Sequence, residues 1–531
     1  MKENNDALIY EVRCKIRNPI QSMRILLIAV LFAAVGCTKL EPVVVVITAT
    51  ATHQNTPALF EATATPDSIV ANLPTSMPET NAVATPIYKT YVVQAGDTLS
   101  GIAARFGVQL QTLLRINQIT DPNVLEVGQI ITLPGEPTTS SPAFKIISDR
   151  RFIRGPGSQQ FDVYAFLNQQ NGYIKAASDS VDEVQLSAAD VVQRVSVEFS
   201  VDARLLLSVL QYRSQWLTEP QIDDNLKQFP IIGKPSTDGI DRSGLYKQLS
   251  WAANQLNAGY YGWKYKGLDT LEFDDGTRLR YSANINAGTV GVQYFFSLQS
   301  DYQSWENAVS SEGLSKIYKS LFGDPLTDDT SVVIPNQQPE LQFPFQSGQT
   351  WFFTGGPHGG WGAGSAWSAI DFAPPDDRPD GSAPCYVSEF WATAVAEGVI
   401  ARSDKGVVVL DLDGDGDETT GWTIMYLHMA SEGRGALGTR VKLGDQIGRP
   451  SCEGGFSNAT HMHIARRYNG EWVPVSCDVC NGDKTSPPPF IMSGWVAVGL
   501  TNQEYQGYMT KGDDRRDAEQ GRLTPVNRIS W

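Results

Sequence analysis

Histidine is scarce in this chain: only five of the 531 residues are histidines, and four of them lie near the C-terminus. Basic residues are outnumbered by acidic ones, 42 to 58, so the formal net charge is −16. This balance argues against nucleic acid as a partner, because phosphates attract basic surfaces. The composition is otherwise that of a globular protein, with 41% hydrophobic and 19% charged residues. The length suggests about three domains.

Long apolar runs are also lacking. The run at residues 25–35 is too short to cross a bilayer as a helix, and Arg24 before it is typical of a signal peptide. The following residues 34–37 (AVGC) resemble a lipobox, in which Cys37 becomes lipidated. We therefore expect a lipoprotein signal peptide at residues 1–37. The 22 residues before Met23 include acids and suit a signal peptide poorly, so we hypothesise that Met23 is the true start, but the sequence does not decide between Met1 and Met23. The mature protein would be extracytoplasmic, lipid-anchored to the cell membrane or associated with the cell wall. A plain secretory signal with an incidental cysteine is the alternative.

Cysteine is used sparingly, with six residues in all. Cys14 precedes the apolar run and Cys37 would carry lipid, which leaves Cys385, Cys452, Cys477 and Cys480. Disulfides are the expected state of these four in an exported protein, although their pairing cannot be deduced. Half of a zinc knuckle at Cys477 and Cys480 is the weaker alternative, because no second such pair lies nearby.

The character of the sequence changes along the chain. Residues 38–88 are rich in Thr, Ala and Pro and almost free of charge, which predicts a flexible linker. Residues 144–335 show helical periodicity. From residue 343 onward the pattern is one of short alternating strands between glycine-rich turns. Examples are helices at 188–199 and 203–217 and strands at 394–401, 406–412 and 422–429.

A compact unit at residues 89–135 lies between the linker and the helical region. It opens with residues 91–103 (YVVQAGDTLSGIA) and closes with residues 127–134 (VGQIITLP). These residues predict a short strand, a turn at Gly96 and Asp97, and a helix capped by Thr98. A second helix at 109–116 and a final strand complete a βααβ unit.

This unit resembles the LysM domain over its whole length. The family binds glycans that contain N-acetylglucosamine, so the resemblance implies that peptidoglycan is a partner. The positions that we expect to contact glycan are Gly96, Asp97, Thr98 and Asn117.

The four C-terminal histidines occur in short motifs that could meet in a folded sheet. His461 and His463 stand two residues apart in a strand-like run, so their side chains share one face while Met462 points away. His428 ends another strand-like run, and a glycine-rich segment supplies His358. Residues 368–372 (SAIDF) add the carboxylate of Asp371. Two histidines and one aspartate with an open fourth position suit a catalytic zinc ion.

These motifs resemble the lysostaphin-like peptidoglycan metallopeptidases, together with residues 394–400 (AVAEGVI) and 441–448 (VKLGDQIG). Most of the family places its first histidine ligand four residues before the aspartate, where this chain has Trp367. The β-lytic (staphylolytic) branch instead has its histidine thirteen residues before the aspartate, which is where His358 stands.

The resemblance implies an antiparallel β fold and one zinc ion held by His358, Asp371 and His463. It assigns His428 and His461 to catalysis without metal binding. Zinc lowers the pKa of bound water towards ~7. One of the two histidines would accept its proton and the other would stabilise the oxyanion, and the sequence does not say which does which.

Two further motifs carry weaker signals. Residues 411–418 (DLDGDGDE) resemble the start of a calcium loop, but Trp422 stands where a bidentate glutamate belongs. We therefore favour a solvated hairpin and keep Ca²⁺ at Asp411–Asp417 as the minor alternative. In the helical region, residues 203–216 and 245–263 resemble helices of lysozyme-like transglycosylases. Arg213 replaces the catalytic acid there, which predicts a domain without glycan-cleaving activity.

Together these features predict a multidomain α+β protein. A signal peptide (1–37) and linker (38–88) precede a LysM module (89–135), a mainly helical, degenerate lysozyme-like domain (144–335), and an antiparallel β metallopeptidase domain with a C-terminal extension (343–531). The expected function is zinc-dependent hydrolysis of peptide bonds in peptidoglycan stem or cross-bridge peptides. The alternative is a non-catalytic wall-binding lipoprotein that scaffolds or activates other hydrolases. Non-catalytic members of such families typically lack the zinc ligands, whereas this chain has a full set of candidates.

Overall fold

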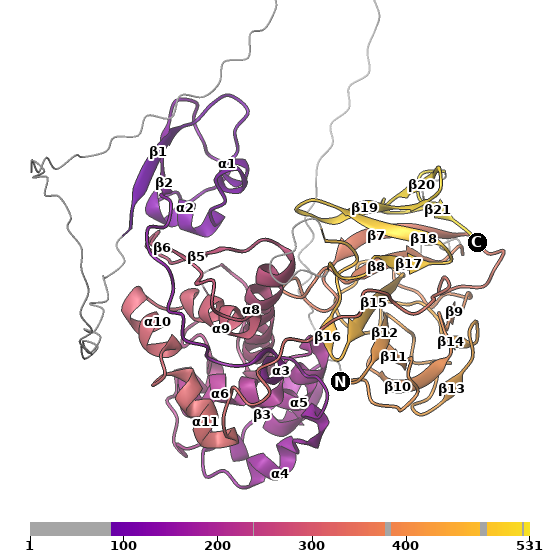
Figure 1. Ribbon diagram of the computed structural model, residues 1–531, viewed down its shortest axis with the longest axis horizontal. Coiled ribbons are helices and arrows are strands. Elements are labelled where there is room, and N and C mark those ends of the chain that lie inside the picture. Colours follow the sequence, from indigo (N-terminus) through magenta and orange to yellow (C-terminus); the bar gives the residue numbers. More distant parts are fainter. Residues whose placement is uncertain (1–85, 237, 377–383, 478–485, 523–524) are drawn as a thin grey trace, which may run out of the picture. The chain divides into compact units, whose positions relative to one another are not determined.

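A computed structural model describes residues 86–236, 238–376, 384–477, 486–522 and 525–531 (Figure 1). The signal peptide, Cys37, Met23 and nearly all of the linker lie outside these residues, as does Cys480. Among the described residues, no helix combines the length and the apolar character needed to cross a membrane.

The unit at the N-terminal end of the described chain is a βααβ fold. Its elements are β1 (Tyr88–Val92), α1 (Leu99–Phe106), α2 (Leu110–Ile116) and β2 (Ile130–Pro134), with β1 and β2 antiparallel. Thr98 caps α1 by accepting a hydrogen bond from the amide of Gly101 at 3.1 Å, as the sequence predicted. A small core of its own, which includes Leu113 and Ile131, holds this unit together.

The middle region is mainly helical. Helix α5 (Ala188–Phe199) begins with a capping box, in which the side chains of Ser187 and Asp190 each bond the other's backbone amide. Helix α6 (Ala203–Ser214) ends earlier than predicted because Gln215 adopts a left-handed conformation with φ 57°. The remaining helices are α3 (Asp149–Phe152), α4 (Val163–Asn168), α7 (Asp224–Gln228), α8 (Leu245–Tyr265), α9 (Ala287–Ser297), α10 (Tyr302–Val309) and α11 (Leu314–Phe322), with short 3-10 turns η1 (Ser158–Gln160) and η2 (Tyr173–Lys175).

Two small hairpins accompany these helices. They are β3 (Ser178–Val181) with β4 (Val184–Ser187), and β5 (Thr270–Glu272) with β6 (Arg278–Arg280).

The C-terminal region is built around an antiparallel sheet that counts nine strands within the described residues, in the order β13-β10-β11-β12-β15-β8-β7-β21, with β16 paired to β15. Its strands are β7 (Trp351–His358), β8 (Ala369–Ala373), β10 (Gly398–Asp404), β11 (Val407–Asp411), β12 (Trp422–Leu427), β13 (Arg440–Val441), β15 (Met462–Tyr468), β16 (Glu471–Trp472) and β21 (Arg528–Ile529). The expected strand at 394–401 is wrong in part, because residues 394–397 connect β9 (Ala392–Thr393) to β10. The antiparallel α+β prediction is confirmed.

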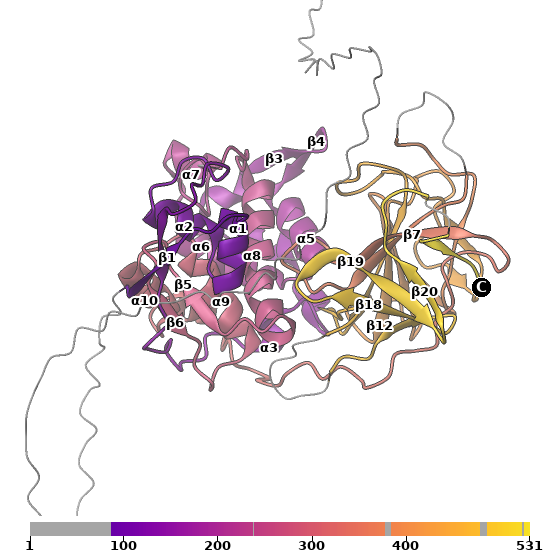
Figure 2. The ribbon, with the colours of Figure 1, turned by 90° about the horizontal axis from the view of Figure 1, so that it is seen from above.

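The two faces of this sheet pack against different cores. Side chains alternate between faces along a strand, so Met462 and Ile464 point into one core while Ala465 points into the other. The core that contains Ala465 is shared with α5, α6, α8 and α9 of the helical region. The helical and sheet regions lie side by side in both ribbon views (Figures 1 and 2).

A second, four-stranded sheet follows the first in sequence. It consists of β17 (Phe490–Met492), β18 (Trp495–Leu500), β19 (Gln503–Lys511) and β20 (Asp514–Asp517), and β14 (Gln446–Gly448) pairs separately with β9. Strand β19 lies beside β7 (Figure 2), and the backbone of Gln506 approaches Gly356 closely. The C-terminal extension therefore returns to the strand that ends in His358.

The expectation of disulfides is met where the chain is described. Cys385 and Cys452 form one disulfide, and Cys477 is also disulfide-bonded.

Candidate metal centre

Four neighbouring strands of the large sheet bring the predicted residues together. Asp371 on β8 is the direct cross-strand partner of His463 on β15, and His463 in turn pairs with Leu427, the residue before His428. His358 ends β7 and pairs with Ala369 on β8. Asp371, His461 and His463 therefore lie on one face of the sheet, as the two-residue spacing predicted.

Three of these side chains converge on one point. Nε2 of His358 lies 2.9 Å from Nδ1 of His463, and each of these nitrogens lies 3.3 Å from Oδ1 of Asp371. A tetrahedral metal ion with ligand bonds of about 2.0–2.1 Å requires ligand atoms about 3.3 Å apart. Oδ1 of Asp371 is buried and accepts no hydrogen bond from the described residues, as a metal-binding oxygen would be. The donor set fits zinc.

In both His358 and His463, the ring nitrogen that points away from Asp371 is hydrogen-bonded to a backbone carbonyl. Nδ1–H of His358 donates to Gly356 O at 2.8 Å, and Nε2–H of His463 donates to Gly360 O at 3.1 Å. These hydrogen bonds fix the tautomers, so that the inner nitrogens present lone pairs to each other and to Asp371. Lone pairs that face one another at this distance suit a bound metal cation.

The charges agree with this arrangement. Burial would raise the pKa of Asp371, but His358 and His461 hold that pKa well below its usual range, so the carboxylate is ionised. Burial lowers the pKa of His463, whose neutral form is the one that binds metal. Burial also acts to lower the pKa of His358, yet the negative charge of Asp371 outweighs it and raises this pKa above its ordinary value.

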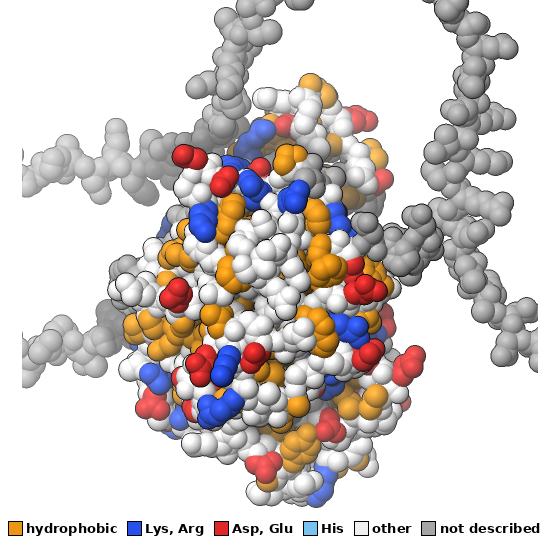
Figure 3. Space-filling model, turned by 90° about the vertical axis from the view of Figure 1, so that its right-hand side faces the viewer, with side chains coloured by type: hydrophobic (Ala, Val, Ile, Leu, Met, Phe, Trp, Pro, Cys, Tyr) orange, Lys and Arg blue, Asp and Glu red, His pale blue; other side chains and the backbone are white. Residues whose placement is uncertain are grey.

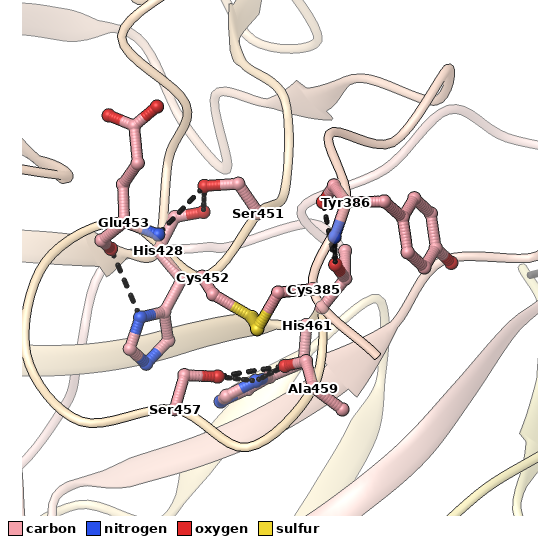
Figure 4. Close-up of a disulfide and its surroundings, with 10 residues drawn as sticks. Cys385, Tyr386, His428, Ser451, Cys452, Glu453, Ser457, Ala459 and His461 are labelled. Atoms are coloured by element: carbon pink, nitrogen blue, oxygen red, sulfur yellow. Dashed lines mark hydrogen bonds between the residues drawn. A yellow bond between two sulfur atoms is a disulfide. The ribbon is translucent and has the colours of Figure 1, made fainter. Parts of the chain in front are cut away.

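His428 and His461 stand beside this cluster. Figure 4 shows both of them hydrogen-bonded to carbonyls of one loop. Their rings lie 4.5 Å apart, and Nε2 of His461 is 3.8 Å from Oδ1 of Asp371. Nδ1–H of His428 donates to Glu453 O at 3.1 Å, and Nδ1–H of His461 donates to Ala459 O at 2.8 Å. Both Nε2 atoms are therefore left as proton acceptors. Burial, followed by the nearby histidines, lowers the pKa of His428 to about 3.

Two site residues in the C-terminal extension escaped the sequence analysis. The ring of Tyr505 stacks on His358, and Glu504 accepts a hydrogen bond from the amide of Gly359 at 3.2 Å. Tyr505 lies near the start of β19 and has φ 65°. No motif marks these residues, because their closeness to His358 depends on the return of the second sheet.

The helical region supports the glycine-rich segment that joins β7 to β8. The amide of Gly364 donates to Oδ1 of Asn254 on α8 at 2.8 Å, and a Cβ on Gly364 would lie 1.9 Å from the backbone oxygen of Asn254. A Cβ on Gly360 would lie 2.5 Å from the ring of Trp472. Trp472 itself donates to Phe199 O and to the hydroxyl of Tyr261. The carbonyl that orients His463 is thus packed indirectly against α5 and α8.

Trp367, four residues before Asp371, has a different partner. Nζ of Lys266 lies over its ring, 4.8 Å from the centroid. Burial lowers the pKa of Lys266 to about 8. Trp367 therefore packs against the helical region, while His358 takes its place in the cluster.

The acidic hairpin at Asp411–Asp417 uses its carboxylates for its own turn. Asp411 accepts hydrogen bonds from the amides of Asp413 and Gly416, and Asp417 accepts from the amide and hydroxyl of Thr419. The side chains of Asp411, Asp413 and Asp415 do approach one another, but these bonds account for the cluster as a hairpin turn. Ca²⁺ at this hairpin therefore stays the minor alternative.

Arg213 in the helical region also makes a structural contact. Its Nε donates to Ile231 O at 2.7 Å, and burial lowers its pKa. A guanidinium remains protonated in a protein, so this position cannot deliver a proton to a glycosidic oxygen.

The residues expected to contact glycan serve the βααβ fold as well. Asp97 accepts hydrogen bonds from the hydroxyl of Tyr91 at 2.6 Å and the amide of Gln94 at 2.8 Å. Asn117 bonds Leu113 and Thr132 of the backbone through both ends of its amide. Gly96 has φ 90° in the turn, and Thr98 caps α1. Their contact with glycan remains a prediction.

Two segments match described families. Residues 91–134 match the LysM domain, and residues 145–336 match the family described as LasA, N-terminal domain. The chain therefore carries a LysM domain, as predicted from its sequence.

Curated relatives match short segments. The N-acetylmuramoyl-L-alanine amidase XlyB of Bacillus subtilis (strain 168) is 59% identical over 44 residues, which cover 8% of this chain and 14% of the relative. The secreted LysM effector ECP6 of Passalora fulva is 30% identical over 107 residues, which cover 19% of this chain and 43% of the relative. The chain thus spans less than half the length of these relatives.

Solved structures are similar at low identity. The M23 metalloprotease pseudoalterin from the deep sea is 22% identical, with 34% of this chain and 96% of that chain covered and a TM-score of 0.26. The catalytic domain of the antimicrobial peptidase lysostaphin from Staphylococcus simulans is also 22% identical, with 24% and 81% covered and a TM-score of 0.16.

Proposed function

We propose that this protein is a zinc-dependent endopeptidase that hydrolyses peptide bonds in the stem or cross-bridge peptides of peptidoglycan. The observation that carries the proposal is the convergence of His358 Nε2, His463 Nδ1 and Asp371 Oδ1, with the tautomers of both histidines fixed by backbone carbonyls. When bound, zinc would acidify water and polarise a peptide carbonyl as a Lewis acid.

The remaining two histidines provide proton transfer. His428 and His461 are each tied through Nδ1–H to a loop carbonyl, so each offers an unprotonated Nε2. One would accept a proton from the attacking water and later deliver it to the leaving amine, which a peptide bond requires before it can break. The other would take a proton from solvent at Nε2 before the reaction and donate it in a hydrogen bond to the oxyanion of the tetrahedral intermediate.

The LysM domain supports peptidoglycan as the substrate. It would hold the enzyme on glycan strands, with contacts from Gly96, Asp97, Thr98 and Asn117. A lipid on Cys37 and the linker at residues 38–88 would tether it to the outer face of the membrane. On the face drawn in Figure 3, acidic and basic side chains of the described residues are interspersed without a continuous basic stripe, consistent with a substrate other than nucleic acid.

The helical region, in this proposal, supports the metal centre and does not cleave glycan. Asn254, Tyr261 and Phe199 contact the segments that position the zinc ligands. Arg213 occupies the place of an acid in the lysozyme-like resemblance. Incubation of the full chain with peptidoglycan should therefore give no new reducing ends and no anhydro-muropeptides.

A non-catalytic scaffold is the other candidate function. Such a protein has no need for a complete set of ligands and two oriented histidines beside them, and this chain has both. The deciding experiment is to incubate the full-length zinc-loaded protein with purified peptidoglycans of known cross-link chemistry and to identify the fragments by mass spectrometry. New amino and carboxyl termini at one type of peptide bond are expected. If the peptides of every peptidoglycan stayed intact, the scaffold function would be the candidate that remains.

A further inference from the structure

The histidines assigned to proton transfer are oriented by one loop, residues 452–460. Glu453 in this loop also accepts hydrogen bonds from the amide and hydroxyl of Ser431. Glu453 O and Ala459 O, near its two ends, accept the Nδ1–H bonds of His428 and His461 (Figure 4). Between these ends the loop has no helix or strand. The Phe456 side chain at its tip is 93% exposed, so apolar packing does not fix the loop.

The base of the loop is fastened to a short segment at residues 384–388, which we call the strap. Thr460 donates its amide to Pro384 O at 3.1 Å and its hydroxyl to Tyr386 O at 2.6 Å. The amide of Ser388 donates to Pro450 O at 2.8 Å on the other side of the loop. The Cys385–Cys452 disulfide joins the strap and the loop covalently between these bonds.

Ser451, which directly precedes the loop, is bonded to the backbone carbonyl of His428. The amide and the hydroxyl of Ser451 both donate to His428 O, at 2.7 and 3.0 Å, and Ser451 pairs with His461 as an isolated β-bridge. Cys452 is the next residue. The disulfide thus closes a small framework in which both histidines and both of their carbonyl partners are included.

We propose that the Cys385–Cys452 disulfide is a positioning element for His428 and His461 and has no part in holding the metal. The ligands His358, Asp371 and His463 lie on β7, β8 and β15 and take their orienting bonds from Gly356 and Gly360, outside loop 452–460. Loss of the disulfide should therefore reduce turnover and leave metal binding intact. The inference rests on the proposed peptidase activity of the same site.

The test compares full-length wild type with the double variant Cys385→Ala/Cys452→Ala. Zinc content and the absorption spectrum of the cobalt-substituted protein report the metal site, and kcat and KM are measured on a peptide fragment of peptidoglycan. The expected result is a kcat at least about tenfold lower, since small misplacements of catalytic groups cost up to about 10²-fold. Zinc content, cobalt spectrum and KM should match wild type.

Cys477→Ala is the matched control, because it removes a disulfide-bonded cysteine outside the loop and the strap. Its kcat should equal that of wild type, and an equal loss in both variants would overturn the inference. An unchanged kcat in the double variant, or loss of zinc together with activity, would also overturn it. If the double variant fails to fold, folded wild type treated with a thiol reductant tests the same point, and an unchanged kcat after the Cys385–Cys452 bond is reduced counts against the inference. An inactive wild type would instead refute the proposed function.

Discussion

The imidazole of His358 stacks on the phenol ring of Tyr505, with ring centroids 4.4 Å apart and planes 20° apart. Tyr505 is 52% exposed, so one side of its ring supports a candidate zinc ligand while the other side meets solvent. The second sheet, which no sequence motif predicted, thereby reaches the candidate metal centre.

Tyr505→Ala should weaken zinc binding by about tenfold, because groups that orient a ligand are worth about 10–100-fold in metal affinity. Tyr505→Phe keeps the stacked ring and should bind zinc as wild type does. Competition with a chromogenic chelator measures both affinities. Equal weakening in the two variants would assign the effect to the hydroxyl and not to the stack.

The ligand set makes a sharp prediction about metal content. His358→Ala, Asp371→Ala and His463→Ala should each lose zinc and activity, whereas Trp367→Ala should keep zinc because its ring packs under Lys266. A strong chelator should abolish activity in wild type, and added zinc should restore it. Metal analysis that finds full zinc in His358→Ala would refute the assignment of the more distant histidine.

The two loop-oriented histidines should behave differently from the ligands. His428→Ala and His461→Ala should retain zinc and lose about 10²–10⁴-fold in kcat, the usual contribution of general acid–base catalysis. The readouts are zinc stoichiometry and steady-state kinetics on the same samples. Loss of zinc from His461→Ala would show that the roles of His461 and His463 have been exchanged.

Close packing of the helical region against the ligand segment predicts an effect at a distance. In Gly364→Ala the new Cβ would lie 1.9 Å from the backbone oxygen of Asn254, so the segment or α8 must move. We expect about a tenfold loss in kcat/KM, because displacement of catalytic groups by about 1 Å is costly. Ala363→Ser, at the exposed neighbouring position, is the control and should keep full activity. Equal activity of the two variants would mean that the support is not needed.

A buried ion cluster links the helical and sheet regions and gives a pH-dependent stability. Glu418 meets Arg154 of the helical region at 3.1 Å and Arg467 of β15 at 2.8 Å. Burial would raise the pKa of Glu418, but Arg402, Arg467 and Arg154 outweigh it and lower the pKa well below its ordinary value. The stabilisation is therefore complete above the unfolded pKa of about 4.3 and is lost as pH falls towards the folded value.

Glu418→Gln should destabilise the protein by about 3–5 kcal/mol at pH 7, because it leaves buried arginines without their counter-charge. The variant should also lose less stability than wild type when the pH is lowered from 5 to about 3. Glu432→Gln removes an exposed partner of Arg449 and should change stability by about 1 kcal/mol or less. Urea unfolding at several pH values measures all three proteins. Parallel pH profiles for wild type and Glu418→Gln would contradict the assignment.

Local sequence signals predicted much of this structure. The helix at Ala188–Phe199 begins and ends where its periodicity does, because Ser187 and Asp190 cap it from within the same short segment. The spacing of His461 and His463 placed them on one face, because alternation is a property of any strand. The strand register then brought Asp371 opposite His463.

Other features depend on parts of the chain that are distant in sequence. Tyr505 reaches His358 only because the second sheet turns back over β7, and Trp472 is buried only because α5 and α8 cover it. The sequence left the pairing of the cysteines open, since spacing does not determine which ones meet. The carbonyls of Gly356 and Gly360 orient His358 and His463 by backbone position, which side-chain patterns do not reveal.

The core shared by the helices and the large sheet also limits which regions of the protein could be exchanged by recombination between genes. A crossover between residues 336 and 343 would part Phe199 from Trp472 and expose apolar surface on both products. A crossover between residues 135 and 144 would leave intact the core of the LysM domain and the core shared by the helices and the large sheet, because these two cores are separate. The LysM domain can therefore be exchanged during evolution, whereas the helical and sheet regions have to be inherited together.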